Sequence, residues 1–196
     1  MFSGLLGELE SRLQLFPGIG KKSAQRLTMH MINNKNNSLK LAQTIQNAIE
    51  RIKNCSQCNI ISETDPCSFC SDPSRDNSKI CVVENTQDVH LINETHEYNG
   101  LFFVLGGLIS PLDGVGPDDI HLEKLKDRVN SMEIKEVILA LNPSSEGEST
   151  INYISEILND KLVKLTRLST GIPFGGDIGY TSKLTLTDAF KRRYSI

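Results

Sequence analysis

Four cysteines give the sequence its strongest chemical signal. Cys55, Cys58, Cys67 and Cys70 form the pattern C-x2-C-x8-C-x2-C within sixteen residues. Each C-x2-C turn can present two sulfurs to one ion, and zinc prefers four thiolates in tetrahedral geometry. Because four protein ligands leave no open position for water, we expect one structural zinc ion per chain and no zinc catalysis. The alternatives are two local disulfides or four unligated cysteines.

A second group of residues is acidic and follows apolar runs. Glu84 directly follows ICVV, and Glu146 and Glu148 lie in NPSSEGEST, which follows VILAL. These carboxylates, with the amide of Asn142 and the hydroxyl of Ser144, are oxygen donors of the kind that magnesium binds. Exposed carboxylates also suit a basic protein surface, because charge complementarity sets the rate and specificity of an encounter. The acidic residues are therefore candidates for weak magnesium binding or for partner binding.

A glycine turn followed by basic residues is the candidate DNA site. In FPGIGKKSAQRL, Gly18 and Gly20 lie in a tight turn, and Lys21, Lys22 and Arg26 follow at the start of a predicted helix. Glycines allow the backbone to approach a partner closely, and unpaired N–H groups at a helix N-terminus can bind phosphate. The spacing resembles the helix-hairpin-helix motif, which contacts backbone phosphates without recognising sequence. The alternative is an ordinary turn with solvated basic side chains.

The charge of the chain is polarised. The 196 residues carry a net charge of −3, but residues 1–54 contain eight Lys and Arg against three Glu, so they carry +5 and the remainder −8. This asymmetry favours the N-terminal quarter as the surface that meets nucleic acid. No run approaches the ~20 apolar residues needed to cross a membrane, and the start MFSGLLGELE lacks a basic signal region. We expect a cytoplasmic protein in a reducing compartment that suits free thiolates.

Hydrophobic periodicity predicts the elements that hold the glycine turn. Apolar residues recur at helical spacing on both sides of it. The predicted helices cover residues 5–13, 21–31 and 41–52. Ser3 and Ser38 are the expected N-caps of the first and third helices. The turn therefore joins two helices, with the basic residues at the start of the second.

After the cysteines, short apolar runs alternate with amphipathic stretches. The predicted strands are 80–83, 101–105, 137–141 and 162–165, and the predicted helices are 118–132 and 149–158. This alternation predicts a mainly parallel, covered sheet, in which functional side chains gather beyond the carboxyl ends of the strands. Glu84 and the run from Asn142 to Glu148 fall at such ends. Cys81 and the Phe pair of LFFVL are expected in the core.

The placement of these acidic residues resembles a Toprim domain, the module that holds magnesium in type IA topoisomerases, primases and related nucleases. The order of the parts resembles the RecR family of bacterial recombination mediators across essentially the whole chain. The matching stretches are FPGIGKKSAQRL, the four cysteines, ICVVEN, VLGGLISPLDGVGP, NPSSEGEST and TRLSTGIPFGGD. The resemblance implies an α+β fold in several parts. These are an N-terminal helix-hairpin-helix region at 1–54, a C4 zinc finger at 55–70, an α/β Toprim domain with a mainly parallel sheet at 78–173, and a C-terminal tail at 174–196.

The resemblance implies a nucleoid-associated, DNA-binding mediator of recombinational DNA repair. RecR proteins form ring-like tetramers that encircle or clamp DNA. They act with RecO and RecF to load RecA on gapped or single-stranded DNA. By this analogy, the basic residues after the glycine turn line the DNA-facing side. The three glutamates belong to the acidic face that the family associates with RecO.

The resemblance also guides the prediction about catalysis. A catalytic Toprim site normally has an Asp-x-Asp pair after the later strand, and here the corresponding residues are Asn142, Pro143 and Ser144. Because an amide and a hydroxyl supply no negative charge, we expect weak magnesium binding and no enzyme activity. Two alternatives stay open: a magnesium-dependent Toprim enzyme acting on nucleic acid, and a zinc-stapled scaffold whose turn binds protein or RNA. The chain departs from the family at Gly179, where an acid is usual, and in LFFVL, where a Tyr-His pair is usual.

Overall fold

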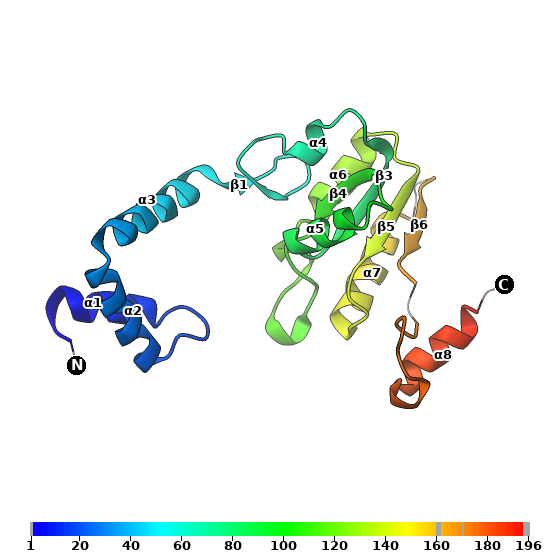
Figure 1. The fold of residues 1–196 in the computed structure, drawn as a ribbon. Helices are drawn as coiled ribbons and strands as arrows, with labels where there is room; N and C mark the ends of the chain where they lie inside the picture. Colours follow the sequence, from blue (N-terminus) through cyan, green and yellow to red (C-terminus); the bar gives the residue numbers. More distant parts are fainter. Residues whose placement is uncertain (1, 160–161, 170, 194–196) are drawn as a thin grey trace. The chain divides into compact units, whose positions relative to one another are not determined.

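The computed structural model describes residues 2–159, 162–169 and 171–193 (Figure 1). The chain divides into two compact units, Met1–Ile52 and Lys53–Ile196. The first unit contains the glycine turn, and the second contains the cysteines and a four-stranded sheet. Within the described residues, every helix is too short or too polar to span a membrane.

Three helices make up the first unit: α1 (Gly4–Leu13), α2 (Lys21–Asn33) and α3 (Lys35–Arg51). α1 packs against α2, and the residues buried on these two helices include Leu13 and Ala24. α2 follows the predicted apolar spacing, whereas α1 departs from it, because Leu5 is 85% exposed and the polar Glu10 is buried. The glycine turn is the connection between them, which places the basic residues at the start of α2.

α3 differs from its prediction at its N-terminus. Ser38, the predicted N-cap, lies inside the helix, where its hydroxyl donates to the carbonyl oxygens of Met31 and Asn34 at 2.8 and 3.1 Å. The chain breaks helical geometry at Asn34 instead, so α3 starts at Lys35. No residue of α3 is buried in the described part of the chain, and its exposed apolar side chains are Leu39, Leu41, Ile45 and Ile49.

The cysteine segment opens the second unit. β1 (Lys53–Asn54) pairs antiparallel with β2 (Ile61–Ser62), and the short helix α4 (Ser68–Ser71) follows. The first C-x2-C turn lies between the two strands, and the second lies at α4. We call this segment, residues 53–71, the finger.

Four parallel strands form the sheet: β3 (Asp76–Val83), β4 (Gly100–Val104), β5 (Glu136–Ala140) and β6 (Lys164–Arg167). Their spatial order is β4-β3-β5-β6. The parallel sheet confirms the prediction. Val83 pairs with both Val104 and Ala140, so β3, β4 and β5 end at the same edge. The residues that follow these strands therefore meet there.

Two layers cover the sheet. On one face, α6 (Leu122–Ser131) and α7 (Ser145–Ile157) pack against alternate strand residues such as Val82 and Phe103. On the other face, α5 (Thr86–Glu94) and the finger pack against Cys81 and Phe102. Successive residues of a strand point to opposite faces, so neighbouring positions serve different layers. The finger is therefore part of the hydrophobic core of the second unit.

The predicted core residues lie where the sequence indicated. Phe102 and Phe103 of β4 are both buried, and so is Cys81 of β3. Burial raises the pKa of the Cys81 thiol to about 12, because the thiolate is poorly solvated there. Cys81 behaves as a small apolar side chain.

Several helices differ from their predictions. α5 is absent from the prediction, α7 starts four residues early, α6 starts four residues late, and α8 (Lys183–Lys191) lies in the predicted tail. Capping residues explain three of these starts: Asn85 and Asp88 form a capping box for α5, Ser144 caps α7 and Ser182 caps α8. Short 3-10 turns complete the fold at Pro111–Asp113, Pro117–Asp119 and Ile178–Tyr180.

Candidate functional site

The four cysteine sulfurs converge in one cluster inside the finger. They lie within 4.8 Å of one another, and none of the four cysteines forms a disulfide. Zinc–sulfur bonds of about 2.3 Å give a tetrahedron with sulfur–sulfur edges of about 3.8 Å. The cluster therefore fits a zinc tetrathiolate with small adjustments. Among the described residues, no other group of three or more Cys, His, Asp or Glu donors converges in this way.

Local hydrogen bonds hold the cysteines in place. The Cys55 N–H donates to the Ile60 carbonyl at 2.8 Å, and the Asn59 N–H donates to the Cys55 carbonyl at 2.9 Å. The Cys70 N–H donates to the Cys67 carbonyl at 3.0 Å. A further bond, from the Cys67 N–H to Cys55 Sγ at 3.3 Å, joins the two pairs. Each C-x2-C turn thus supplies two of the four sulfurs of the site.

Contacts outside the cysteine pattern attach the finger to the sheet. Asn59 Nδ2 donates to the carbonyl of Val104 at 3.0 Å, and the Val104 N–H donates to the Cys58 carbonyl at 2.9 Å. The rings of Phe69 and Phe102 meet edge to face with centroids 5.4 Å apart. The metal-binding segment is therefore tied to the end of β4 by both backbone and side chains.

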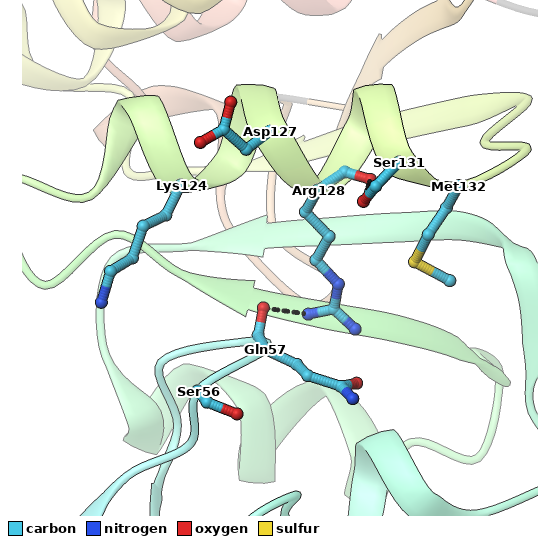
Figure 2. Close-up of a pocket in the computed structure, with 7 residues that line it drawn as sticks. All are labelled: Ser56, Gln57, Lys124, Asp127, Arg128, Ser131 and Met132. Atoms are coloured by element: carbon cyan, nitrogen blue, oxygen red, sulfur yellow. Dashed lines mark hydrogen bonds between the residues drawn. The ribbon is translucent and has the colours of Figure 1, made fainter.

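Arg128 of α6 is a contact that the sequence analysis missed. Its side chain points from α6 toward the finger (Figure 2), where it donates to Cys70 Sγ at 3.3 Å and to the Gln57 carbonyl at 2.9 Å. A cavity of about 530 Å³ lies beside it. Arg128 is three residues after the buried Leu125 and directly before the buried Val129. That position on the apolar stripe of an amphipathic helix is the signal that could have revealed it.

Glu84 and Asn142 meet at the carboxyl edge of the sheet. The Asn142 side-chain amide donates to Glu84 Oε2 at 3.4 Å. A groove of about 170 Å³ lies there, and its other lining residues are Asp88, Leu91, Ile92, Ala140 and Leu168. Leu91 and Leu168 are 63% and 55% exposed. The edge therefore combines carboxylates with accessible apolar side chains.

Glu146 and Glu148 lie in the first turn of α7, where the helix dipole favours acidic groups. The N–H of Glu146 itself and the hydroxyls of Ser144 and Ser145 donate to the Glu146 carboxylate and hold its pKa below the usual range. Glu148 accepts two hydrogen bonds from Arg167, at 2.8 and 3.0 Å. In the described part of the chain, the three glutamates form no donor group that converges as the cysteines do.

The glycine turn of the first unit leaves its backbone accessible. Gly18 has a φ of +78°, a left-handed conformation that favours glycine. Gly20 is the N-cap of α2, and no atom lies within 4 Å of the position that a Cβ would take there. No side chain caps α2, so the N–H groups of its first turn are not satisfied by a cap. Lys21, Lys22 and Arg26 are exposed beside this helix start.

Three family models match consecutive parts of the chain. The model described as RecR, helix-hairpin-helix matches residues 6–49. The RecR model for a zinc finger domain with four cysteines matches residues 52–72, and the Toprim domain model matches residues 78–169. These ranges cover the glycine turn, the cysteine cluster and the parallel sheet in turn.

Curated relatives match over nearly the full length. The chain is 42% identical over 190 residues to Recombination protein RecR of Syntrophobacter fumaroxidans, covering 96% of this chain and 94% of that protein. The protein of the same name from Leifsonia xyli is 42% identical over 197 residues, and the alignment covers 100% of both chains. The one from Legionella pneumophila is 42% identical over 189 residues, with 96% and 95% covered. The chain belongs to the RecR family of recombination proteins.

Proposed function

We propose that this protein is a DNA-binding recombination mediator without enzyme activity, which acts with RecO- and RecF-like partners to load RecA on gapped or single-stranded DNA. Membership of the RecR family supports a role in recombinational DNA repair at the nucleoid. The observation that carries the proposal is the coincidence, at one turn, of an open glycine backbone, an uncapped helix start and exposed basic side chains.

The turn suits contact with DNA phosphates. Free N–H groups at the start of α2 and the positive end of its dipole attract an anion. Lys21, Lys22 and Arg26 add positive charge on the same turn and the next one. The open space at Gly20 allows a phosphate to approach the backbone closely. Contacts of this kind carry no sequence information, so binding is expected on any DNA sequence.

The acidic edge of the sheet suits a basic protein partner, which we assign to the RecO-like protein. Glu84 offers a carboxylate beside a groove that also exposes Leu91 and Leu168. Glu146 adds a second carboxylate in the first turn of α7. Carboxylates around an apolar groove complement a surface of basic and aliphatic side chains.

The same edge is poorly built for magnesium catalysis. Glu148 is engaged by Arg167, and the residue beside Glu84 is the neutral Asn142. Phosphoryl-transfer sites hold magnesium with several carboxylates directed at one point. Weak magnesium binding without turnover is therefore the behaviour we propose.

The finger holds one structural zinc ion per chain in this proposal. Cys55, Cys58, Cys67 and Cys70 would supply all four ligands, and the ion would contribute folding energy and no reaction step. The match to the RecR zinc finger model supports this metal. Because the finger and α5 together pack on one face of the sheet, the ion would stabilise the second unit as a whole.

The protein is proposed to assemble into a ring-like tetramer around DNA. The apolar side of α3 supports self-association, because Leu39, Ile45 and Ile49 are 70%, 48% and 76% exposed in the single chain. An apolar stripe of this length on a soluble protein is a common site of association. Measurement of native mass with and without DNA tests this part of the proposal.

Charge reversal at the glycine turn tests the DNA surface. We expect Lys22→Glu or Arg26→Glu to weaken binding to all DNA sequences about equally. The slope of log affinity against log salt should flatten by about 0.9 for each lost contact with duplex DNA. Gly20→Ala should leave the fold intact, since its Cβ meets no atom of the chain, and should weaken binding by blocking the phosphate.

Lys135→Glu is the matched control, because Lys135 is exposed in the second unit, outside the turn. Fluorescence anisotropy over a range of salt concentrations measures the affinities, and circular dichroism checks the fold. If Lys22→Glu and Arg26→Glu bind DNA with the affinity and salt slope of Lys135→Glu, the DNA surface lies elsewhere and the scaffold alternative is favoured.

A further inference from the structure

Arg128 is a buried cation of the second unit. Its side chain is only 7% exposed, and it lies in the same helix as the buried residues Leu122, Leu125 and Val129. Moving a guanidinium out of water costs several kcal/mol unless hydrogen bonds and an opposite charge replace the solvent. The neighbours of Arg128 must therefore provide both.

Three hydrogen bonds satisfy part of this requirement. Arg128 NH1 donates to the carbonyl oxygens of Gln57 at 2.9 Å and Phe102 at 3.1 Å. NH2 donates to Cys70 Sγ at 3.3 Å. Two of these acceptors are neutral carbonyls, so the sulfur is the acceptor that can carry a negative charge.

The guanidinium of Arg128 contacts no carboxylate among the described residues. Within the described residues, none of the ion pairs between basic and acidic side chains includes Arg128. Its neighbour Asp127 points away from the guanidinium on the opposite side of α6 (Figure 2). The counter-charge must come from the cysteine cluster that the guanidinium contacts.

The charge of a metal-loaded cluster supplies what the cation lacks. Four thiolates and one zinc ion carry a formal net charge of −2. We propose that Arg128 is the charge-balancing and positioning residue of the metal centre, donating to the Cys70 thiolate while its other nitrogen fixes the finger on β4. This inference rests on the proposed zinc site.

The geometry makes Arg128 a link between three segments. Gln57 and Cys70 belong to the finger, Phe102 belongs to β4, and Arg128 itself belongs to α6. Hydrogen bonds to metal-bound ligands orient them, and their loss commonly weakens metal affinity about 10- to 100-fold. The same bonds add to the contacts of Asn59, Cys58 and Phe69 that dock the finger on the sheet, so loss of Arg128 should affect both metal retention and docking.

Substitution of Arg128 in the full-length protein tests this link. Arg128→Met removes the charge and keeps an unbranched side chain, while Arg128→Lys keeps the charge and a donor. Lys124→Met is the matched control, since it removes a charge from an exposed position of the same helix that lines the same cavity. Zinc affinity is measured by competition with a chromophoric chelator. The absorption bands of cobalt-substituted protein report the thiolate environment.

We expect zinc affinity about 10- to 100-fold lower in Arg128→Met, partial rescue in Arg128→Lys, and no change in Lys124→Met. The cobalt–thiolate bands should shift in Arg128→Met alone. Equal zinc affinity in Arg128→Met and wild type overturns the inference, and so does an Arg128→Lys variant that loses zinc as readily as Arg128→Met.

If Arg128→Met shows no cooperative unfolding, the comparison is made between Arg128→Lys and Arg128→Gln, which both keep a donor and differ in charge. Equal zinc affinity in that pair refutes the role of charge. A wild-type protein that binds no zinc refutes the zinc site itself, whereas zinc-loaded wild type with an unaffected Arg128→Met refutes only the role of Arg128.

Discussion

Gly147→Ala is expected to destabilise the second unit. Gly147 is buried in the first turn of α7, and a Cβ added there would overlap with the carbonyl oxygen of Asn142. That carbonyl also accepts a hydrogen bond from the Ser144 N–H at 2.9 Å. The obstacle is therefore a hydrogen-bonded backbone atom, which cannot rotate away as a flexible side chain would.

The magnitude follows from three contributions. Alanine in place of glycine favours a helix by at most about 1 kcal/mol. Forcing an extra atom into a packed site costs about 1–3 kcal/mol. If the loop moves to relieve the overlap, the bond from the Gly147 N–H to Ser144 Oγ, now 3.1 Å, is lost, at about 1 kcal/mol. The net loss of unfolding free energy is about 1–3 kcal/mol.

Denaturant unfolding measures this loss, with Gly116→Ala as the matched control. Gly116 has a φ of −98°, and the nearest atom to its added Cβ is Asp119 Oδ2 at 3.6 Å. We expect Gly116→Ala to change stability by less than about 0.5 kcal/mol. Because the Asn142 amide contacts Glu84, Gly147→Ala should also weaken partner binding at the acidic edge. A Gly147→Ala protein as stable as wild type would refute the close approach of the Asn142 carbonyl to Gly147 in α7.

Two other predictions concern the metal and the acidic edge. Chelation or Cys58→Ser should lower the melting temperature without removing any catalytic step, because the finger packs with α5 on one face of the sheet. Folded protein that contains well under one zinc per chain and melts unchanged in the presence of chelator would contradict this prediction. Glu84→Ala or Glu146→Ala should weaken binding of the RecO-like partner and leave zinc content and DNA affinity unchanged. Magnesium-dependent cleavage or joining of nicked, supercoiled or single-stranded DNA that disappears in Glu84→Ala would overturn the non-enzyme proposal.

Local patterns were sufficient for much of the fold. Each C-x2-C spacing defines a turn whose two sulfurs face one point, so the cysteine cluster could be predicted without any tertiary information. Apolar runs located β4 and β5 to within one residue, because the sheet is covered on both faces and its strands are therefore largely apolar. The parallel sheet then placed Glu84 and Asn142 at a common edge before any contact between them was known.

Contacts between distant segments could not be predicted in this way. Arg128 looks like a solvated basic residue of an amphipathic helix until the finger is docked beside it. The pair of Glu148 and Arg167 joins residues from α7 and β6, and nothing in either local pattern indicates it. Gly147 did carry a signal, since a glycine among helix-forming residues commonly marks a close approach of backbone.

The metal centre and the acidic edge are connected through the end of β4. The Val104 N–H donates to the carbonyl of Cys58, and two residues later the Gly106 N–H donates to the carbonyl of Glu84 at 3.0 Å. Loss of the metal would free Cys58 to move. Val104, the last residue of β4, would then lose the carbonyl oxygen that accepts its N–H. We therefore expect chelation to lower the affinity for the RecO-like partner together with stability. DNA binding by the helices of the first unit should persist, since the finger lies outside that unit. Zinc-free protein that binds the partner with wild-type affinity would show that the sheet alone holds Glu84 in place.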